Sequence, residues 1–408
     1  MKICKNFLAC LLLLILLTGC SMGNAVSDGI NANEAETSEQ DGGGGDSASS
    51  KKELEDMLDS MTLREKVGQL FVVRPDALDF TKTQEQINDS DEAGATTLTP
   101  EMAEMMKNYP VGGIVMFGKN LESPEQITAF NQDLQQASDI PLLIAVDEEG
   151  GRVARLANHE GFDLPKYESA AAVGASGKYD DGFAMGNTIG AYLHNYGFNM
   201  DFAPVADVNT NPNNPVIGER AFSSDASVAA LMAGAMADGL HAQGITPVFK
   251  HFPGHGDTAE DSHQGIAISY KTKEELRACE WLPFEEADGN DCIMVGHIAL
   301  PNVCNNLTPA TLSHEIVHDI LKESLGFDGL VITDSLSMDA ITKEYSPGDA
   351  AIGALQAGCD LLLMPNGLQE AFDAVVEAVE QGVISEPQLD ETVLRILTFK
   401  QEQGLFNE

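Results

Sequence analysis

One segment of the chain concentrates groups that can bind and transfer protons. It runs from Lys250 to His263 and holds three of the nine histidines, His251, His255 and His263. Asp261 stands two residues before His263, close enough in a loop for its carboxylate to orient and charge the imidazole. Because an imidazole has a pKa of about 6.5, it can give and take a proton near neutral pH. The pattern therefore predicts general acid–base chemistry, although an Asp-x-His pair can also be a simple surface hydrogen bond.

A metal site is the first alternative explanation for so many histidines. Pro253, Gly254 and Gly256 predict a loop in this segment, so that its histidines share no helix face. The H-E-x-x-H motif is absent, and the cysteines show no CxxC pair or other metal spacing. We therefore expect neither a metal nor a cofactor in this site.

Other titratable residues follow short apolar runs that are typical of β-strands. In a barrel of parallel strands, catalytic groups lie at the carboxyl ends of the strands. A single strand-end aspartate often only caps the next helix, so the prediction of a common site depends on the joint pattern. The residues concerned are Asp147, Asp207, Arg220, Lys250, His251, His297 and Asp334.

The elements that must position these residues alternate regularly from residue 51 onward. Strands are predicted at 67–73, 113–117, 142–146, 199–203, 245–250, 292–296, 330–333 and 360–364. Helices are predicted in the gaps, for example at 224–243, 313–325 and 369–381. Local start signals support them: Thr62 and Glu65 form a capping box, while Thr99-Pro100 and Ser123-Pro124 place an N-cap before proline.

Eight such units predict an α/β fold, a (β/α)₈ TIM barrel with a single catalytic domain at 51–408. Continuous apolar strands suit a parallel sheet that is buried on both faces. A doubly wound open sheet is the alternative, weakened by the lack of G-x-G-x-x-G after an early strand. The polar stretch 76–98 is predicted to be a long loop inserted after the first strand, where it could shape the rim of the site.

Composition excludes several other classes of protein. The 408 residues include 43% hydrophobic residues, which is too many for a mainly disordered chain. Lys and Arg number 23 and Asp and Glu 64, giving a net charge of −41. So negative a chain repels nucleic acid and anionic membrane surfaces, and we expect no nucleic-acid partner.

The N-terminus has the features of a bacterial export signal. Lys2 and Lys5 precede an apolar run at 7–17 that is too short to span a bilayer comfortably. The sequence Leu17-Thr18-Gly19-Cys20 resembles a lipobox, although an ordinary signal with a chance cysteine is the alternative. We expect residues 1–19 to be a signal peptide and Cys20 to be lipidated. Residues 20–50, which are rich in Gly and Ser, would then be a disordered tether to the outer face of the cytoplasmic membrane. Cys292 and Cys359 are expected to be buried small hydrophobes, without a disulfide framework.

Several motifs together resemble a known family. The stretch from Lys250 to His263 is similar to the K-H-F-P-G-H-G-x₄-D-S-H signature of the family 3 glycoside hydrolases, β-N-acetylglucosaminidase (NagZ-like) branch. Other segments resemble further motifs of this family in the same order, and they lie at 146–153, 199–207, 217–222 and 331–338. The resemblance covers about residues 60–405 and implies the TIM barrel as the fold.

The resemblance also implies a role for each matching residue. Asp334 would be the nucleophile that forms a covalent glycosyl-enzyme. His263 would be the general acid and then the general base, with Asp261 as its dyad partner, in place of the second carboxylate of most retaining glycosidases. The groups that would hold the hydroxyls of the sugar are Asp147, Arg220, Lys250 and His251.

The implied activity is retaining exo-β-N-acetylhexosaminidase action on terminal β-linked GlcNAc of peptidoglycan fragments. GlcNAc-containing cell-wall saccharides would be the partners, the membrane would be contacted only through the lipid, and the chain would act as a monomer. Many relatives carry a further C-terminal domain, whereas this chain ends at Glu408; we therefore expect the single-domain form. A β-glucosidase-type hydrolase, a sugar-binding lipoprotein without catalysis, and phosphorolysis in place of hydrolysis remain alternatives.

Overall fold

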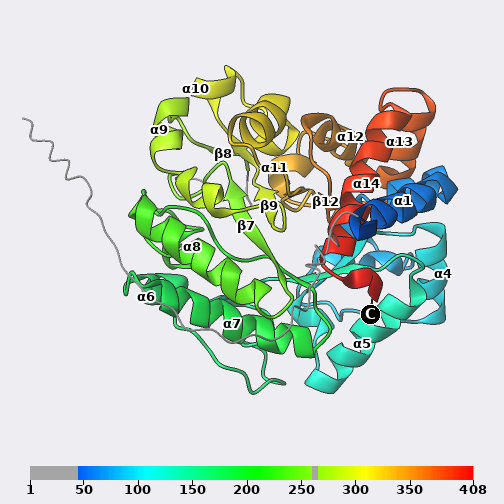
Figure 1. Cartoon of the computed structure of the whole chain (residues 1–408), viewed down its shortest axis with the longest axis horizontal. Helices are drawn as coiled ribbons and strands as arrows, with labels where there is room; N and C mark the ends of the chain where they lie inside the picture. The colour runs from blue at the N-terminus through cyan, green and yellow to red at the C-terminus, as the bar shows by residue number, and fades with distance from the viewer. Residues whose placement is uncertain (1–44, 260–264, 408) are drawn as a thin grey trace, which may run out of the picture. The chain divides into compact units, whose positions relative to one another are not determined.

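The fold is a barrel of eight parallel strands surrounded by helices (Figure 1). The computed structural model describes residues 45–259 and 265–407. The expected signal peptide, Cys20 and most of the expected tether lie outside these residues, as do Asp261 and His263. Residues 47–408 form one compact unit.

The strands follow one another around the barrel in sequence order. Phe71 pairs with Leu362 and Val72 with Gly113, so that the first strand lies between the second and the last. A parallel bridge between Ile332 and Leu361 joins the two ends of the sheet, as a closed barrel requires and an open sheet does not. The predicted (β/α)₈ barrel is therefore confirmed. Its strands are β1 (Phe71–Val73), β2 (Gly113–Met116), β3 (Leu143–Val146), β6 (Met200–Asp201), β7 (Thr246–Phe252), β9 (Cys292–Val295), β11 (Leu330–Thr333) and β12 (Leu362–Leu363).

Helices fill the crossovers between strands. Thr99 and Ser123 cap helices α4 and α5 as their sequences predict, each accepting a hydrogen bond from a backbone N–H of the first turn. The main helices are α1 (Gly45–Ser60), α2 (Leu63–Gly68), α4 (Pro100–Asn108), α5 (Pro124–Ala137), α7 (Tyr179–Asn195), α8 (Ala226–His241), η6 (Glu315–Ser324), α12 (Pro347–Ala357), α13 (Leu368–Glu380) and α14 (Glu386–Glu402).

Shorter elements lie in the connections between the strands and the main helices. They are η1 (Pro75–Leu78), α3 (Gln84–Asn88), η2 (Gly118–Asn120), α6 (Ala170–Gly174), η3 (Gly218–Arg220), α9 (Lys273–Ala278), η4 (Leu282–Glu286), α10 (Pro301–Cys304), η5 (Ala310–Leu312), α11 (Asp339–Thr342) and η7 (Leu405–Asn407). Two small sheets pair β4 (Glu148–Gly150) with β5 (Val153–Ala154), and β8 (Ala267–Ile268) with β10 (Ile298–Ala299).

The predicted start of the first strand is wrong. The first strand begins at Phe71, because the capping box of Thr62 and Glu65 starts a helix that continues through Val67 to Gly68. Helix α1 begins at Gly45, ahead of the expected boundary at 51. Its buried residues Leu54 and Leu58 stand one turn apart and pack into the core, which favours a helix through this region.

The stretch 76–98 is more regular than the predicted loop. It contains η1 and α3, and it is organised around the carboxylate of Asp76, which is fully buried. The Asp76 oxygens accept hydrogen bonds from Asn120 Nδ2 (2.8 Å), Lys82 Nζ (2.9 Å) and the backbone N–H of Ala95 (3.0 Å). A buried carboxylate needs such partners, and these three join the two ends of the insert to the segment after β2.

The cysteines behave largely as expected. Cys292 and Cys359 are buried, and all four cysteines of the described chain, which also include Cys279 and Cys304, are free thiols. Within the described ranges, the structure contains no helix that is both long enough and apolar enough to cross a bilayer.

The amino end of the barrel, opposite the strand ends that carry the predicted site, contains a buried cation. Lys400 of α14 is fully buried, and its Nζ donates hydrogen bonds to Gln69 Oε1 (2.8 Å) and to the carbonyl oxygen of Gly112 (2.9 Å). These partners precede β1 and β2, and neither is charged. Burial therefore lowers the pKa of the Lys400 ammonium to about 7.

Replacing Lys400 by Met should remove a pH-dependent component of stability. Between the folded pKa and the unfolded pKa of about 10.4, the unfolded chain binds the additional proton, so stability rises with pH. The free energy of unfolding of the wild type should gain up to about 1.4 kcal/mol per pH unit relative to Lys400→Met over this window. Urea unfolding at roughly pH 6.5 and pH 9 measures the difference. Lys107→Met, at an exposed lysine, is the control. If the difference in unfolding free energy between the wild type and Lys400→Met did not change with pH, the lowered pKa of Lys400 would be contradicted.

Candidate active site

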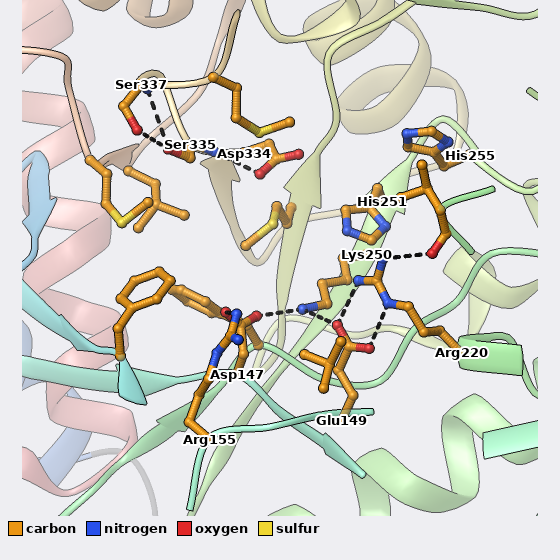
Figure 2. A pocket seen from close by; sticks show the side chains of 18 of the residues that line it. Asp147, Glu149, Arg155, Arg220, Lys250, His251, His255, Asp334, Ser335 and Ser337 are labelled. Atoms are coloured by element: carbon orange, nitrogen blue, oxygen red, sulfur yellow. Dashed lines mark hydrogen bonds and ion pairs between the residues drawn. The ribbon is translucent and has the colours of Figure 1, made fainter. Parts of the chain in front are cut away.

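The carboxyl ends of the barrel strands surround a cavity of ≈ 380 Å³. It brings together the described members of the predicted site, and Figure 2 shows their side chains facing the same space. These residues are Asp147, Arg220, Lys250, His251 and Asp334. The two remaining members, Asp261 and His263, lie outside the described residues.

Asp334 directly follows β11, and the surrounding backbone fixes its position. Its own N–H donates to the carbonyl oxygen of Val295 (2.8 Å), which continues the pairing of β11 with β9. The N–H of Ser335 donates to Asp334 Oδ1 (2.7 Å). The side chain is half-buried and lines the cavity. A carboxylate oxygen is thus held at the floor of the cavity by a rigid strand.

His297 does not line this cavity, although it also follows a strand. It is buried, and its Nε2 donates to the carbonyl oxygen of Ser335 (2.8 Å) while Nδ1 pairs with Thr311 Oγ1 (2.7 Å). His297 therefore supports the backbone immediately after Asp334.

Lys250 lies at the centre of a buried ion network. Its Nζ is 2.7 Å from Asp147 Oδ1 and 2.7 Å from Glu149 Oε1. Arg220 binds Glu149 in a bidentate manner, through Nε (2.8 Å) and Nη2 (2.7 Å). Arg155 Nη2 contacts the second oxygen of Asp147 at 3.1 Å. Figure 2 shows these side chains forming one continuous row along the cavity.

The network sets the charge of both carboxylates. Burial alone would raise their pKa values, but the neighbouring cations outweigh it. Lys250 and Arg155 hold the pKa of Asp147 well below its usual range, and Arg220 and Lys250 lower that of Glu149 to about 2. Both side chains are therefore ionised acceptors of hydrogen bonds and cannot serve as proton donors at neutral pH.

A further buried carboxylate, Asp207, positions His251 at the end of β7 and His255 in the loop that follows. Asp207 Oδ2 accepts from His251 Nδ1 (2.8 Å), and Oδ1 accepts from the backbone N–H of His255 (2.6 Å). Because Nδ1 is engaged by Asp207, Nε2 is the ring nitrogen of His251 that remains for other contacts. Burial lowers the pKa of His255, whose Nδ1 pairs with Thr258 Oγ1 (2.7 Å). Both rings thus have defined orientations.

The glycines of the loop are required by its path. Gly254 has φ +115°, a conformation that other residues rarely adopt. A Cβ at Gly256 would overlap the carbonyl oxygen of Val208. The amide of Asn214 donates to the carbonyl oxygens of His255 (2.8 Å) and Thr258 (3.0 Å). The loop is therefore held against the segment that follows β6 up to the point where the described chain stops.

Sequence reasoning missed Glu149, which is as central as Lys250. Three acidic residues follow β3 in succession. They differ only in which side of the extended segment their side chains face. Asp147 and Glu149 face the cavity, whereas Glu148 points into the protein. The Glu148 carboxylate accepts hydrogen bonds from the N–H groups of Leu156 and Ala157 (both 2.8 Å) and from Tyr192. Side chains of an extended segment alternate between two sides, so the sequence could have indicated that Glu149 faces the same side as Asp147.

The insert contributes to the rim of the cavity, as expected. Its Asn88 is one of the lining residues. Arg74 donates to the carbonyl oxygen of Ile87 (2.8 Å) and lies over the Phe117 ring at 4.2 Å. Arg155 lies 5.2 Å from the same ring. Arg74 and Phe117 were not singled out in the sequence, because their roles depend on where the insert folds.

Residues 62–399 match the family described as "Glycosyl hydrolase family 3 N terminal domain". Beta-hexosaminidase A of Pseudoalteromonas piscicida is 35% identical over 338 residues, which are 76% of this chain. Beta-hexosaminidase of Xylella fastidiosa is 35% identical over 288 residues, covering 69% of this chain and 84% of the relative. The chain spans only 56% of the Pseudoalteromonas protein.

A solved structure agrees with these relatives. It is a glycoside hydrolase family 3 beta-N-acetylglucosaminidase from Paenibacillus sp., with a TM-score of 0.77 and 35% identity, over 85% of this chain and 64% of that one. The match to the family model covers most of the barrel and the strand ends that form the cavity. The chain therefore belongs to glycosyl hydrolase family 3.

Proposed function

We propose that this protein is a retaining exo-β-N-acetylhexosaminidase that removes terminal β-linked GlcNAc from peptidoglycan fragments. The observation that carries the proposal is that Asp334 lines the same cavity as Asp147 and Glu149, two buried carboxylates that are paired with cations. The names of the relatives support the sugar: two are beta-hexosaminidases and one is a beta-N-acetylglucosaminidase.

Asp334 is the nucleophile in this proposal. A carboxylate at this position can attack the anomeric carbon as a nucleophile. The attack forms a covalent glycosyl-enzyme as the bond to the leaving oxygen breaks, and water then releases the sugar. The backbone contacts of Asp334 restrict its motion, which favours an attack of fixed direction.

The ion network provides the binding site for the sugar. Asp147 and Glu149 can accept hydrogen bonds from hydroxyl groups, and Arg220 and Lys250 can donate them. His251 adds an imidazole nitrogen held in place by Asp207. Charged hydrogen bonds of this kind are worth about 1.5–3 kcal/mol each, which is enough to hold one sugar ring in register with Asp334.

His263, with Asp261 as partner, is the proposed general acid and base. Asp147 and Glu149 cannot take this role, since their low pKa values keep them ionised. The loop that carries the proposed pair follows β7, and its His255 lines the cavity beside His251, which lies in β7. In the first step an imidazolium of His263 protonates the leaving oxygen, and the neutral imidazole that results then takes a proton from the incoming water.

Asp334→Asn should reduce turnover of the nitrophenyl β-glycoside of GlcNAc by at least about a thousandfold, because the amide cannot form the glycosyl-enzyme. Asp339→Asn is the matched control: this exposed carboxylate lines the same cavity and pairs with Lys343 (3.1 Å). Initial rates measure both variants. Undiminished turnover by Asp334→Asn would exclude it as the nucleophile.

The same assay separates the alternative activities. The wild type should prefer the GlcNAc glycoside to the glucose glycoside and should cleave GlcNAc–MurNAc. Equal rates on both nitrophenyl glycosides would favour the β-glucosidase type, and absence of turnover on either would favour a binding protein. In the presence of phosphate, release of GlcNAc-1-phosphate in place of GlcNAc would indicate phosphorolysis.

His263→Ala should affect substrates according to their leaving groups. Chitobiose needs a proton on the departing oxygen, so its hydrolysis should fall by about 10²–10⁴-fold. Nitrophenolate leaves without that proton, so the nitrophenyl substrate should lose much less in the step that forms the glycosyl-enzyme. Steady-state and pre-steady-state rates on both substrates, with His194→Ala as an exposed-histidine control, measure the contrast. Equal losses on both substrates would exclude His263 as the acid.

We further propose that Cys20 carries a lipid anchor, so that the barrel acts as a monomer on the outer face of the cytoplasmic membrane. The supporting features are the short apolar run and the L-T-G-C sequence at 17–20. Two or three acyl chains, at about 0.8 kcal/mol per buried CH₂, would hold the protein stably.

Cys20→Ser should release the protein from membranes. Detergent phase separation of cells that express the full chain should move the variant into the aqueous phase, because no acyl chains are added. Cys10→Ser, within the expected signal, serves as the control and should stay in the detergent phase. Equal partitioning of the wild type and Cys20→Ser would contradict lipidation at this residue.

A further inference from the structure

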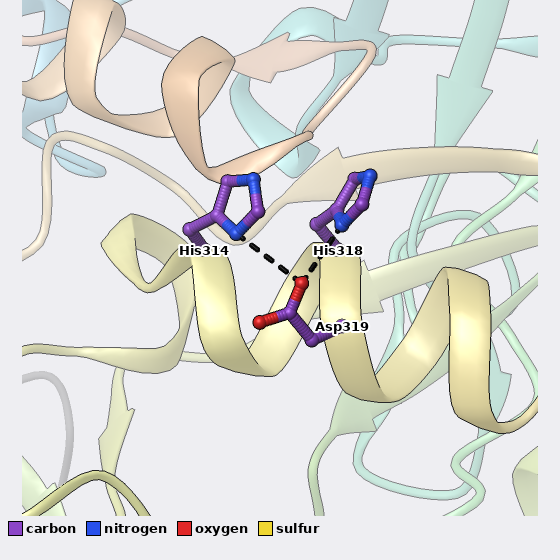
Figure 3. A group of neighbouring side chains, drawn as sticks. All are labelled: His314, His318 and Asp319. Carbon is purple, nitrogen blue, oxygen red and sulfur yellow. Dashed lines mark hydrogen bonds and ion pairs between the residues drawn. The ribbon is translucent and has the colours of Figure 1, made fainter.

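Two histidines and an aspartate form a separate cluster on the outside of the barrel. His314 directly precedes η6, and His318 and Asp319 lie within its first half; none of the three lines the cavity. Their side chains are 60%, 45% and 57% exposed. One potential ligand atom from each lies within 4.8 Å of the other two. Figure 3 shows both imidazole rings directed toward one oxygen of Asp319.

The helix type explains how the three residues meet. In an α-helix, positions 314 and 318 would be neighbours, but position 319 would be turned away from both. Helix η6 is a π-helix, and at its end Leu325 N donates to the carbonyl oxygen of Ile320, five residues back. Because a turn of a π-helix is wider than a turn of an α-helix, the residues four and five positions after a given residue both lie beside it. His318 and Asp319 therefore both contact His314.

The contacts are those of ligands that are already oriented. His318 Nδ1 is 2.9 Å and His314 Nδ1 is 3.4 Å from the same oxygen, Asp319 Oδ1. The two rings stack with their centroids 4.4 Å apart. A carboxylate that bonds one nitrogen of a histidine fixes the ring and leaves the other nitrogen for a metal, a common arrangement around zinc. Small rotations of these exposed side chains would let two imidazoles, or two imidazoles and the carboxylate, reach one ion.

The surroundings favour a cation at this place. The opposite face of η6 is anchored in the core through Ile316, Val317, Ile320 and Leu321, so the cluster stands on a fixed support. The chain carries a net charge of −41, which raises the concentration of cations near its surface. Imidazole and carboxylate together suit zinc and its neighbours in the periodic table better than calcium or magnesium, which prefer oxygen ligands alone.

We propose that His314, His318 and Asp319 form a surface site for a divalent transition-metal ion such as Zn²⁺. The protein supplies two imidazole nitrogens and a carboxylate that coordinates or orients them, and water completes the coordination. The ion links the first turn of η6 and stabilises the folded chain. Because the three residues lie outside the cavity, this role is separate from glycoside hydrolysis and does not depend on the proposed activity.

Calorimetric titration of the whole folded chain with Zn²⁺ tests the site. The wild type should bind an ion that His314→Ala/His318→Ala does not bind, and each single histidine variant should bind at least about tenfold more weakly. His194→Ala is the matched control, since it removes a lone exposed histidine and should leave binding unchanged. All substituted side chains are exposed, so the variants should fold, which circular dichroism verifies.

Three further readouts identify the ligands. Asp319→Asn should also weaken binding, and Cu²⁺ should bind more tightly than Ni²⁺ or Zn²⁺, as imidazole sites generally do. Zinc should raise the unfolding temperature of the wild type and not that of the double variant, because only an ion bound to the folded state stabilises it. Binding that is unchanged in the double variant, or that is equally strong for Ca²⁺, would overturn the proposal.

Discussion

The placement of the Lys250 ammonium between Asp147 and Glu149 is the interaction on which the rest of the site depends. A buried cation is tolerated only with close counter-charges, and here two carboxylates lie 2.7 Å away on either side. Arg220 and Arg155 complete the balance. These side chains come from β7, from the segment after β3 and from the loop after β6, so the network can form only when the barrel has closed around it.

This network also divides the chemical roles among the residues of the cavity. Because Asp147 and Glu149 are held ionised, they can bind hydroxyl groups but cannot give up a proton. Asp334 directly follows β11, where hydrogen bonds of the backbone fix its position. The division explains why a loop histidine is a reasonable acid in this protein, where most retaining glycosidases use a second carboxylate.

The pKa values of the buried lysines at the two ends of the barrel are shifted in opposite directions. At the carboxyl end, acidic neighbours outweigh burial and raise the pKa of Lys250. At the amino end, Lys400 has only an amide and a carbonyl as partners, and burial lowers its pKa to about 7. The contrast follows the general division of such barrels, in which one end carries the chemistry and the other contributes to stability.

Local patterns along the chain were enough to predict the barrel and five of the described residues that line its cavity, Asp147, Arg220, Lys250, His251 and Asp334. Continuous apolar runs such as 330–333 predict strands buried on both faces, and the polar residues that end them are then expected near the common end of the barrel. Asp334 lines the cavity as this pattern predicts, whereas His297 supports the backbone behind it. Alternation separates Glu148 from Asp147 and Glu149, but which of the two sets faces the cavity depends on how the segment after β3 packs. The tertiary structure also decided that the insert at 76–98 folds around Asp76, and that a π-helix brings Asp319 to His314. The reason is physical: hydrophobic periodicity is local and is written in the sequence, whereas ion pairs and side-chain clusters depend on distances that exist only after distant segments have packed together.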